Sequence, residues 1–283
     1  MSRSMQFKAI IRNMALKNRI PAQAVLQNFM LERLLERIYL SDYRDNFILK
    51  GGMLISSLVG IENRTTMDMD ATLKGYPLDA ALLERALQDI CAVQVEDDAV
   101  FDLNQITPIR DDDEYGGYRA AITADYESIR VPLKIDLTVG DVITPRAIRL
   151  AYQSNFEDRV FDIWAYNLET ILAEKIETIL RRGALNTRMR DFYDVYIIAV
   201  TRQSEVDGLI LKNALIATMQ KRESLNAWDE SSNLLAAIRQ DAFMPQRWSR
   251  YAAENNYTKS ITFEETLEKI RDILLLAKRE ADA

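Results

Sequence analysis

Two aspartates have the type and spacing to bind a divalent metal ion. Asp68 and Asp70 are separated by one residue in 66–73, where Asp alternates with Met or Ala. A period of two is typical of a β-strand, whose alternate side chains share one face, so both carboxylates project to the same side. Two like charges that close are unfavourable unless a cation lies between them. An isolated pair of this kind often arises by chance, so it needs support from other residues.

A third carboxylate follows in the apolar run 131–139. Alternation there places Lys134 and Asp136 on one face and Ile135 with Leu137 on the other. A charged face on a strand is usually only the solvated face. If this strand lies beside the strand of Asp68, however, Asp136 completes a cluster of three carboxylates. Such oxygen ligands bind the paired divalent ions used in phosphate-transfer chemistry.

Residues that could contact phosphate lie upstream of these carboxylates. Lys50, Gly51 and Gly52 stand between a short apolar run and a compact apolar segment, which predicts a strand-to-helix turn. Glycines there let backbone N–H groups and a helix N-terminus approach phosphate closely, although a Gly-Gly pair is more often only a tight turn. A further cation and hydroxyls for the same phosphates are found in Arg64, Thr65 and Thr66.

The second half of the chain adds a lysine and two aspartates. Helical spacing in 168–180 places Lys175 near the middle of an apolar stripe, where it needs an anionic partner or a route to water. The alternative is a surface lysine that snorkels from the stripe, and we expect Lys175→Met to leave stability unharmed. Asp191 and Asp194 share a face of the next helix, where they cap it or where Asp191 pairs with Lys175.

A basic segment spans the same two helices. Its cations are opposed only by Glu177, although the chain as a whole is acidic. We expect this segment to bind a polynucleotide phosphate or the tail of a triphosphate. Its members are Lys175, Arg181, Arg182, Arg188 and Arg190.

The spacing of apolar residues along the chain predicts an α+β fold, with a mixed sheet followed by a mostly helical C-terminal region. Helical spacing predicts helices at 21–40 and 78–91, and β-like runs alternate with turns between 92 and 140. After residue 165 the sequence is typical of helix almost throughout. We expect three parts: an N-terminal helical segment at 1–40, a core at 41–160 and a helical domain at 161–283.

Composition excludes several classes of protein. The chain has 283 residues, no histidine and one cysteine, Cys91, so imidazole catalysis, histidine-zinc sites and an internal disulfide framework are ruled out. It has neither a long apolar run nor a leader pattern, so we expect a cytoplasmic protein without membrane contact. The net charge of -7 argues against general polyanion binding but leaves room for a local basic surface.

In combination and in order, these motifs resemble the AbiEii/AbiGii toxin family of nucleotidyltransferases over roughly residues 40–200. The resemblance implies a polymerase-β-like core, a nucleoside triphosphate donor, Mg²⁺ or Mn²⁺, and a place in a toxin–antitoxin or abortive-infection system used in phage defence. The motifs that carry it are Lys50-Gly51-Gly52, Arg64 to Asp70, Lys134-Ile135-Asp136, Ala173-Glu174-Lys175 and Arg190 to Asp194.

The resemblance also implies roles for individual residues. It makes Gly51 and Gly52 the phosphate turn and Asp68 and Asp70 the metal ligands, and it points to Lys175 and Asp191 as essential residues of the helical half. The expected catalytic set is therefore Asp68, Asp70, Asp136, Lys175 and Asp191. The chain departs from the family pattern at Met67 and Met69, which stand where a charged or β-branched residue is frequent. That departure leaves the metal ligands in place.

The function expected from the sequence is therefore transfer of a nucleoside monophosphate to an acceptor with release of pyrophosphate. The resemblance points to the 3′ end of tRNA as the acceptor, and to an antitoxin encoded nearby, with or without direct contact. One alternative is transfer to a protein or to a small molecule such as an aminoglycoside, which the acidic charge favours. Another is a non-catalytic nucleotide-binding module, against which the intact set of carboxylates speaks.

Overall fold

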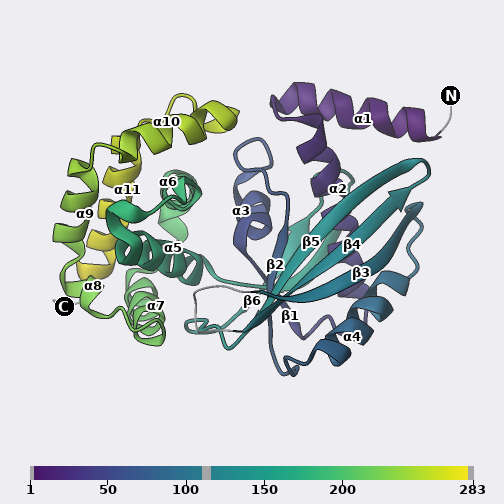
Figure 1. The fold of residues 1–283 in the computed structure, drawn as a ribbon, viewed down its shortest axis with the longest axis horizontal. Coiled ribbons are helices and arrows are strands. Elements are labelled where there is room, and N and C mark those ends of the chain that lie inside the picture. The colour runs from purple at the N-terminus through teal and green to yellow at the C-terminus, as the bar shows by residue number, and fades with distance from the viewer. Residues whose placement is uncertain (1–2, 110–115, 280–283) are drawn as a thin grey trace. The chain divides into compact units, whose positions relative to one another are not determined.

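A computed structural model of the chain describes residues 3–109 and 116–279, which form two compact units (Figure 1). The first unit comprises Met1–Asp141 and Ile148–Ala165, and the second comprises Val142–Ala147 and Tyr166–Ala283. Each unit is described by itself below.

The first unit is built on a seven-stranded mixed sheet in the order β3-β4-β5-β2-β1-β7-β6. Strand β2 runs parallel to β5, and β1 runs parallel to β7, while the other neighbouring pairs are antiparallel. The strands are β1 (Phe47–Lys50), β2 (Met69–Leu73), β3 (Ala99–Ile109), β4 (Gly117–Tyr126), β5 (Ile129–Val139), β6 (Ile148–Gln153) and β7 (Val160–Ala165).

Helices cover the apolar face of this sheet. In β5, Val131, Leu133 and Ile135 are buried, whereas the residues that alternate with them are exposed or half-buried. Helix α2 passes behind the strands in Figure 1, and α4 lies beside β3. Charged residues on the opposite, polar face of β5 are therefore accessible to a ligand. The helices of this unit are α1 (Arg3–Asn18), α2 (Ala22–Leu40), α3 (Gly51–Val59) and α4 (Ala80–Ala92).

A buried carboxylate fixes α2 to the turn between β6 and β7. Glu32 is 1% exposed and accepts hydrogen bonds from Tyr152 Oη, Ser154 Oγ and both nitrogens of Asn155. Burial raises the pKa of Glu32, and these donors offset only part of the effect. Because every donor comes from one short segment, the carboxylate ties α2 to that segment.

The second unit is helical. Helix α5 buries its apolar stripe, and the fully buried Glu177 accepts from Arg181, Arg222 and Ser224, which joins α5 to the end of α7. Across both described parts of the chain, no helix has the length and apolar character to cross a membrane. The helices are α5 (Leu168–Arg182), α6 (Met189–Arg202), α7 (Gly208–Lys221), α8 (Asn226–Asp229), α9 (Ser231–Gln240), α10 (Met244–Glu254) and α11 (Phe263–Arg279).

The predicted fold class is confirmed: a mixed sheet is followed by a mostly helical C-terminal region. The strand, glycine turn and helix around residue 50 and the strands at 69–73 and 129–139 are also found. The N-terminal segment expected to be helical contains α1, a helix whose bounds the sequence analysis did not give, and the strands β6 and β7 were not foreseen. The three-part division at residues 40 and 160 stays a prediction.

Candidate active site

Four charged residues form a row across four adjacent strands. Asp70 of β2 is in register with Asp136 of β5 on one side and with Lys50 of β1 on the other. Arg119 of β4 is in register with Asp136 and extends the row. Residues directly opposite one another on neighbouring strands share a face. The row therefore places two carboxylates between two cations on one face of the sheet.

Asp68 adds a third carboxylate to the same face. It immediately precedes β2, and the intervening Met69 is fully buried, so Asp68 and Asp70 both lie on the opposite, half-buried side. Within the described part of the chain, the Asp68 carboxylate has no hydrogen-bond or ion-pair partner. An unpaired, half-buried carboxylate next to a second one is a site where a hard divalent cation would be stabilised.

The first residue of α3 lies against Asp70. Gly51 has a φ of +68°, and a Cβ at this position would be 2.0 Å from Asp70 Oδ2 and 2.8 Å from Asp70 Cβ. Only glycine fits both this left-handed backbone and this close approach. The start of α3, with its free N–H groups, is thereby held beside the carboxylate.

Gly52 rests on buried side chains of the segment that precedes the aspartates. A Cβ on Gly52 would be 2.8 Å from Thr66 Oγ1 and 3.2 Å from a guanidinium nitrogen of Arg64. Arg64 and Thr66 are only 2% and 4% exposed, and Arg64 donates to the carbonyl oxygen of the half-buried Thr65. The side chains of Arg64 and Thr66 therefore pack against the glycine turn at Gly52. The phosphate contacts expected of them stay predictions.

Lys50 is held by an ion pair at the end of β5. Its Nζ donates to Asp141 Oδ2 at 2.5 Å and to Thr138 Oγ1 at 2.8 Å, and Thr138 Oγ1 also donates to Asp141. Burial raises the pKa of Asp141, but the Lys50 charge and the hydrogen bonds outweigh it and leave the pKa below its ordinary value. Lys50 is therefore fixed as a cation beside Asp70.

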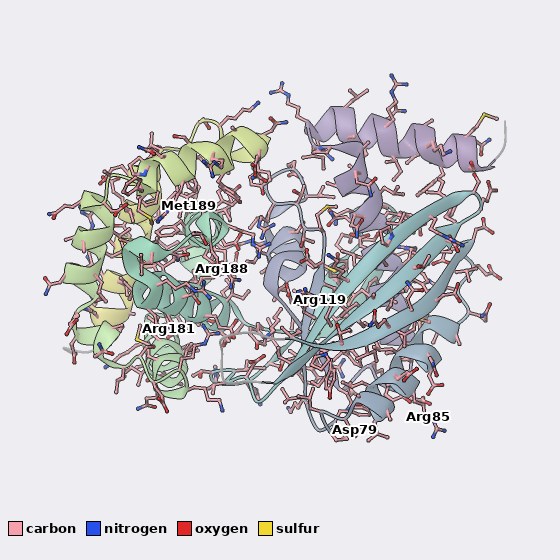
Figure 2. All side chains as sticks on the ribbon, viewed as in Figure 1. Asp79, Arg85, Arg119, Arg181, Arg188 and Met189 are labelled. Atoms are coloured by element: carbon pink, nitrogen blue, oxygen red, sulfur yellow. The ribbon has the colours of Figure 1, made fainter. Side chains whose placement is uncertain are left out.

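Asp136 is held by Arg119, and here the structure departs from the expected cluster of three carboxylates. Arg119 Nε and Nη2 each donate to one oxygen of Asp136 at 2.7 Å, and Arg119 is labelled on the sheet in Figure 2. In residues 3–109 and 116–279, no three acidic or cysteine side chains are placed to hold one metal ion. The bidentate arginine satisfies the carboxylate that would be the third ligand. Lys134 is exposed two residues earlier on the same strand face.

The helical unit contains a separate ionic cluster. Lys175 Nζ donates to Asp191 Oδ1 at 2.7 Å and lies 2.8 Å from Asp194 Oδ2, and both aspartates are almost completely buried. Burial lowers the pKa of Lys175, but the two carboxylates outweigh it and raise the pKa above its ordinary value. The predicted pairing of Lys175 with Asp191 is therefore present, and a snorkelling surface lysine is excluded.

The basic segment of the helical unit is partly neutralised. Arg181 pairs with Glu177 at 2.8 Å, and Arg188 pairs with Asp191 at 3.2 Å; both arginines are labelled in Figure 2. Arg190 is exposed and has no ion-pair partner among the residues that the structure describes. Arg182 is half-buried, so Arg190 is an exposed cation of this segment that is not neutralised by an ion pair within the described residues.

Comparison with known proteins identifies the family. The model of the nucleotidyl transferase AbiEii toxin family, from type IV toxin–antitoxin systems, matches residues 33–269. The chain belongs to this AbiEii family. It is therefore a nucleotidyltransferase of a toxin–antitoxin system, and membership implies an antitoxin partner. The family generally uses a nucleoside triphosphate and a divalent metal ion.

Two solved structures from Helicobacter pylori resemble the chain at low identity. A candidate nucleotidyltransferase has 17% identity and a TM-score of 0.49, and the match covers 93% of this chain and 98% of that one. The protein JHP933 has 17% identity and a TM-score of 0.48, with 92% of this chain and 94% of that one covered. No match is found among curated protein sequences.

Three residues of this candidate site escaped the sequence analysis: Arg119, Thr138 and Asp141. Strand alternation could have placed Thr138 on the face of Asp136, since the two are separated by one residue. The partners of Arg119 and Asp141 depend on strand register and on the turn after β5, which no local pattern reveals.

Proposed function

We propose that the chain transfers a nucleoside monophosphate from a nucleoside triphosphate to an RNA acceptor, the 3′ end of tRNA, with a divalent metal ion held by Asp68 and Asp70. The single observation that carries this proposal is the contact between the start of α3 and Asp70. A helix N-terminus favours phosphate, and a carboxylate pair favours a cation. A metal–triphosphate complex needs both at one place.

The residues fit a metal that is shared with the substrate. Mg²⁺ is usually held by one or two carboxylates together with substrate phosphates and water. Asp68 and Asp70 supply two carboxylates on one face, and the Asp68 carboxylate has no partner in the described part of the chain. When bound, the ion would neutralise the triphosphate and polarise the phosphorus that is attacked.

Neighbouring groups would position the triphosphate and the acceptor for this reaction. The N–H groups of Gly51 and Gly52 bind triphosphate oxygens, with the Lys50 charge close by. Asp136 acts on the acceptor hydroxyl or as a further ligand, and for either role Arg119 must release it. The side chain of Arg119 is 47% exposed, so a phosphate can reach its guanidinium group from solvent.

In the helical unit, we propose that Lys175 and Asp191 are required for activity because they hold α5 and α6 together. Both groups are satisfied within their own cluster. Arg190 is proposed to bind phosphate, since it is the exposed cation next to this cluster. Exposed, unpaired cations contribute to polyanion binding, whereas paired ones contribute little.

The test is incorporation of each of four labelled nucleoside triphosphates into tRNA, into protein and into aminoglycosides. We expect label in tRNA with Mg²⁺ or Mn²⁺, and a loss of turnover by at least about a hundredfold in Asp68→Asn and Asp70→Asn. Asp102→Asn, an exposed aspartate of β3, is the control and should retain activity. Full activity in both site variants would refute the proposed metal site. Label in protein or aminoglycoside instead of tRNA would refute the acceptor.

A further inference from the structure

Helix α1 is a basic element in an acidic chain. The first 31 residues include five basic residues and no acidic one, whereas the net charge of the whole chain is -7. Charges of a single sign over such a length cannot be neutralised within their own segment. The five basic residues are Arg3, Lys8, Arg12, Lys17 and Arg19.

One side of α1 is docked on the first unit. Phe7 is buried and stacks on Tyr126 with ring centroids 4.3 Å apart, and it also packs against Phe29 of α2 at 4.7 Å. The backbone N–H of Ser4 donates to Glu127 Oε2 in the turn between β4 and β5. The helix therefore presents a fixed outer side.

The outer side carries unpaired cations. Lys8, Arg12 and Lys17 are exposed, and none has an ion-pair partner among residues 3–109 and 116–279. Lys8 and Arg12 are one helical turn apart and project together, while Lys17 lies further around the helix near its end. Unpaired surface cations release counterions when they meet phosphates, so each can contribute to polyanion binding.

The first turns of α2, the helix that follows α1, contact the segment that precedes Asp68. Gln27 of α2 donates to the carbonyl oxygens of Met67 and Pro132, and Asn28 donates to that of Thr66. Gln27 is only five residues after the start of α2, a rise of roughly 7.5 Å. A polyanion bound along α1 would thus extend to the neighbourhood of the aspartates.

We propose that the exposed side of α1 binds the phosphate backbone of the RNA acceptor. The inference rests on the proposed function only in that the acceptor is RNA. The family model begins at residue 33, so α1 lies outside the matched region and would be a recognition element of this chain.

Charge complementarity favours RNA over a lipid surface. A helix that lies in a membrane interface needs a continuous apolar face toward the lipid. The apolar side of α1 is already buried against the first unit, and Met5, Ile10 and Leu16 are exposed among polar and basic residues. Anionic lipid would therefore meet the same cations with only separate apolar side chains, and no continuous apolar face, to insert.

The test compares two triple variants that remove the same charge. The first is Lys8→Gln/Arg12→Gln/Lys17→Gln. The control is Arg85→Gln/Arg250→Gln/Lys259→Gln, which changes exposed cations elsewhere; Figure 2 shows Arg85 projecting outward from α4. Binding to a labelled tRNA is measured from 50 to 300 mM salt, with nucleoside triphosphate binding and melting temperature measured on the same preparations.

We expect the α1 variant to bind tRNA at least about a hundredfold more weakly at 50 mM salt, with the slope of log K against log salt smaller by about two to three. Its triphosphate binding and melting temperature should match the wild type, and the control should bind tRNA normally. Equal loss in both variants, or no loss in the α1 variant, would refute the α1 surface while the RNA acceptor stands. If the wild type labels another acceptor and does not bind tRNA, the proposed RNA acceptor is refuted. The proposed role of α1, which depends on it, is then refuted as well. Loss of binding to anionic vesicles with unchanged tRNA binding would assign the surface to lipid.

Discussion

At the scale of single residues, the site depends on a contact that only glycine permits. Gly51 combines a φ of +68° with a Cβ position 2.0 Å from Asp70 Oδ2. A methyl group there must displace the Asp70 side chain, because the clash includes Asp70 Cβ as well as the flexible carboxylate. The geometry thus makes the glycine turn and the carboxylate a single unit.

We predict that Gly51→Ala lowers turnover by at least about a hundredfold, because it moves a proposed metal ligand. The backbone strain itself should lower stability by only about 1–2 kcal/mol. Gly183→Ala is the matched control, since Gly183 also has a positive φ, of 52°, but no atom within 4 Å of its Cβ position. Steady-state kinetics measure the turnover of both variants, and urea unfolding measures their free energies of unfolding. Comparable activity in the two would show that the Gly51 contact is not needed.

The ion pair between Lys50 and Asp141 predicts a particular dependence of stability on pH. The pKa of Asp141 is lower in the folded chain than its ordinary value of 3.8, so its contribution is complete well above that value and is lost as pH falls through the folded pKa. We predict that Asp141→Asn is less stable than the wild type by roughly 1.5–3 kcal/mol near pH 6, the range for a hydrogen bond to a charged group. The difference should shrink below pH 3.8. Urea unfolding at several pH values measures it, and a constant difference would contradict the assignment.

At the scale of elements, the sequence predicted the local pieces but not how they pair. The alternation of Asp68 to Leu73 and of 131–139 identified two strands and their polar faces, and these are β2 and β5. The helical spacing at 168–180 predicted α5, which extends to Arg182. Each of these patterns is local, because burial of one face repeats along the segment itself.

What could not be predicted depends on distant residues. The parallel pairing of β2 with β5 and of β1 with β7 sets which charged residues become neighbours, and nothing in either strand specifies its partner. Arg119 therefore gave no sign that it would hold Asp136. The bounds of helix α1 were not predicted because large apolar residues, Met5, Ile10 and Leu16, also lie on its exposed side and obscure the helical spacing.

The Lys175 cluster joins two helices, and this changes what its substitution should do. From the sequence alone, Lys175→Met was expected to leave stability unharmed. In the structure, methionine would leave Asp191 and Asp194 buried without their shared cation. Removing one partner of a buried ion pair typically costs about 3–5 kcal/mol.

We therefore predict that Lys175→Met is less stable than the wild type by about 3–5 kcal/mol, with Lys175→Arg closer to the wild type. Arg190→Met, which changes an exposed cation on the same helix as the aspartates, should alter stability by less than about 0.5 kcal/mol. Thermal or urea unfolding of the three variants provides the measurement. A fully stable Lys175→Met protein would contradict the proposed contribution of the cluster to stability.

At the scale of the whole molecule, a single net charge hides how charge is distributed. The value of -7 argues against a general polyanion binder, yet the first 31 residues are free of acid and the helical unit exposes Arg190. Some acidic residues elsewhere form ion pairs with arginine or lysine, as Glu177 and Asp194 do. In an acidic protein, RNA is repelled from the negatively charged surface and attracted to local cationic surfaces. The cationic surfaces therefore decide which part of the protein the RNA contacts.

The division into two units leads to a final prediction about ligand binding. Because the chain splits into a unit with the sheet and a helical unit, calorimetric unfolding need not be two-state. We predict that nucleoside triphosphate with Mg²⁺ or Mn²⁺ raises the transition of the sheet unit, by about 2.7 kcal/mol at a ligand concentration of one hundred times Kd. The transition that Lys175→Met lowers identifies the helical unit, so the two can be told apart.

The same experiment separates a two-carboxylate site from a three-carboxylate one. With Asp136 held by Arg119, Asp68 and Asp70 provide too few ligands for tight binding of metal alone, so metal without triphosphate should give little stabilisation. Metal and triphosphate together should give much more than either alone, and chelation with EDTA should remove the difference. Asp68→Asn and Asp70→Asn should lose this synergy while the α1 triple variant keeps it. Strong stabilisation by metal alone would instead mean that Arg119 releases Asp136 to the ion, and Arg119→Gln should then strengthen metal binding further, since it frees the third carboxylate.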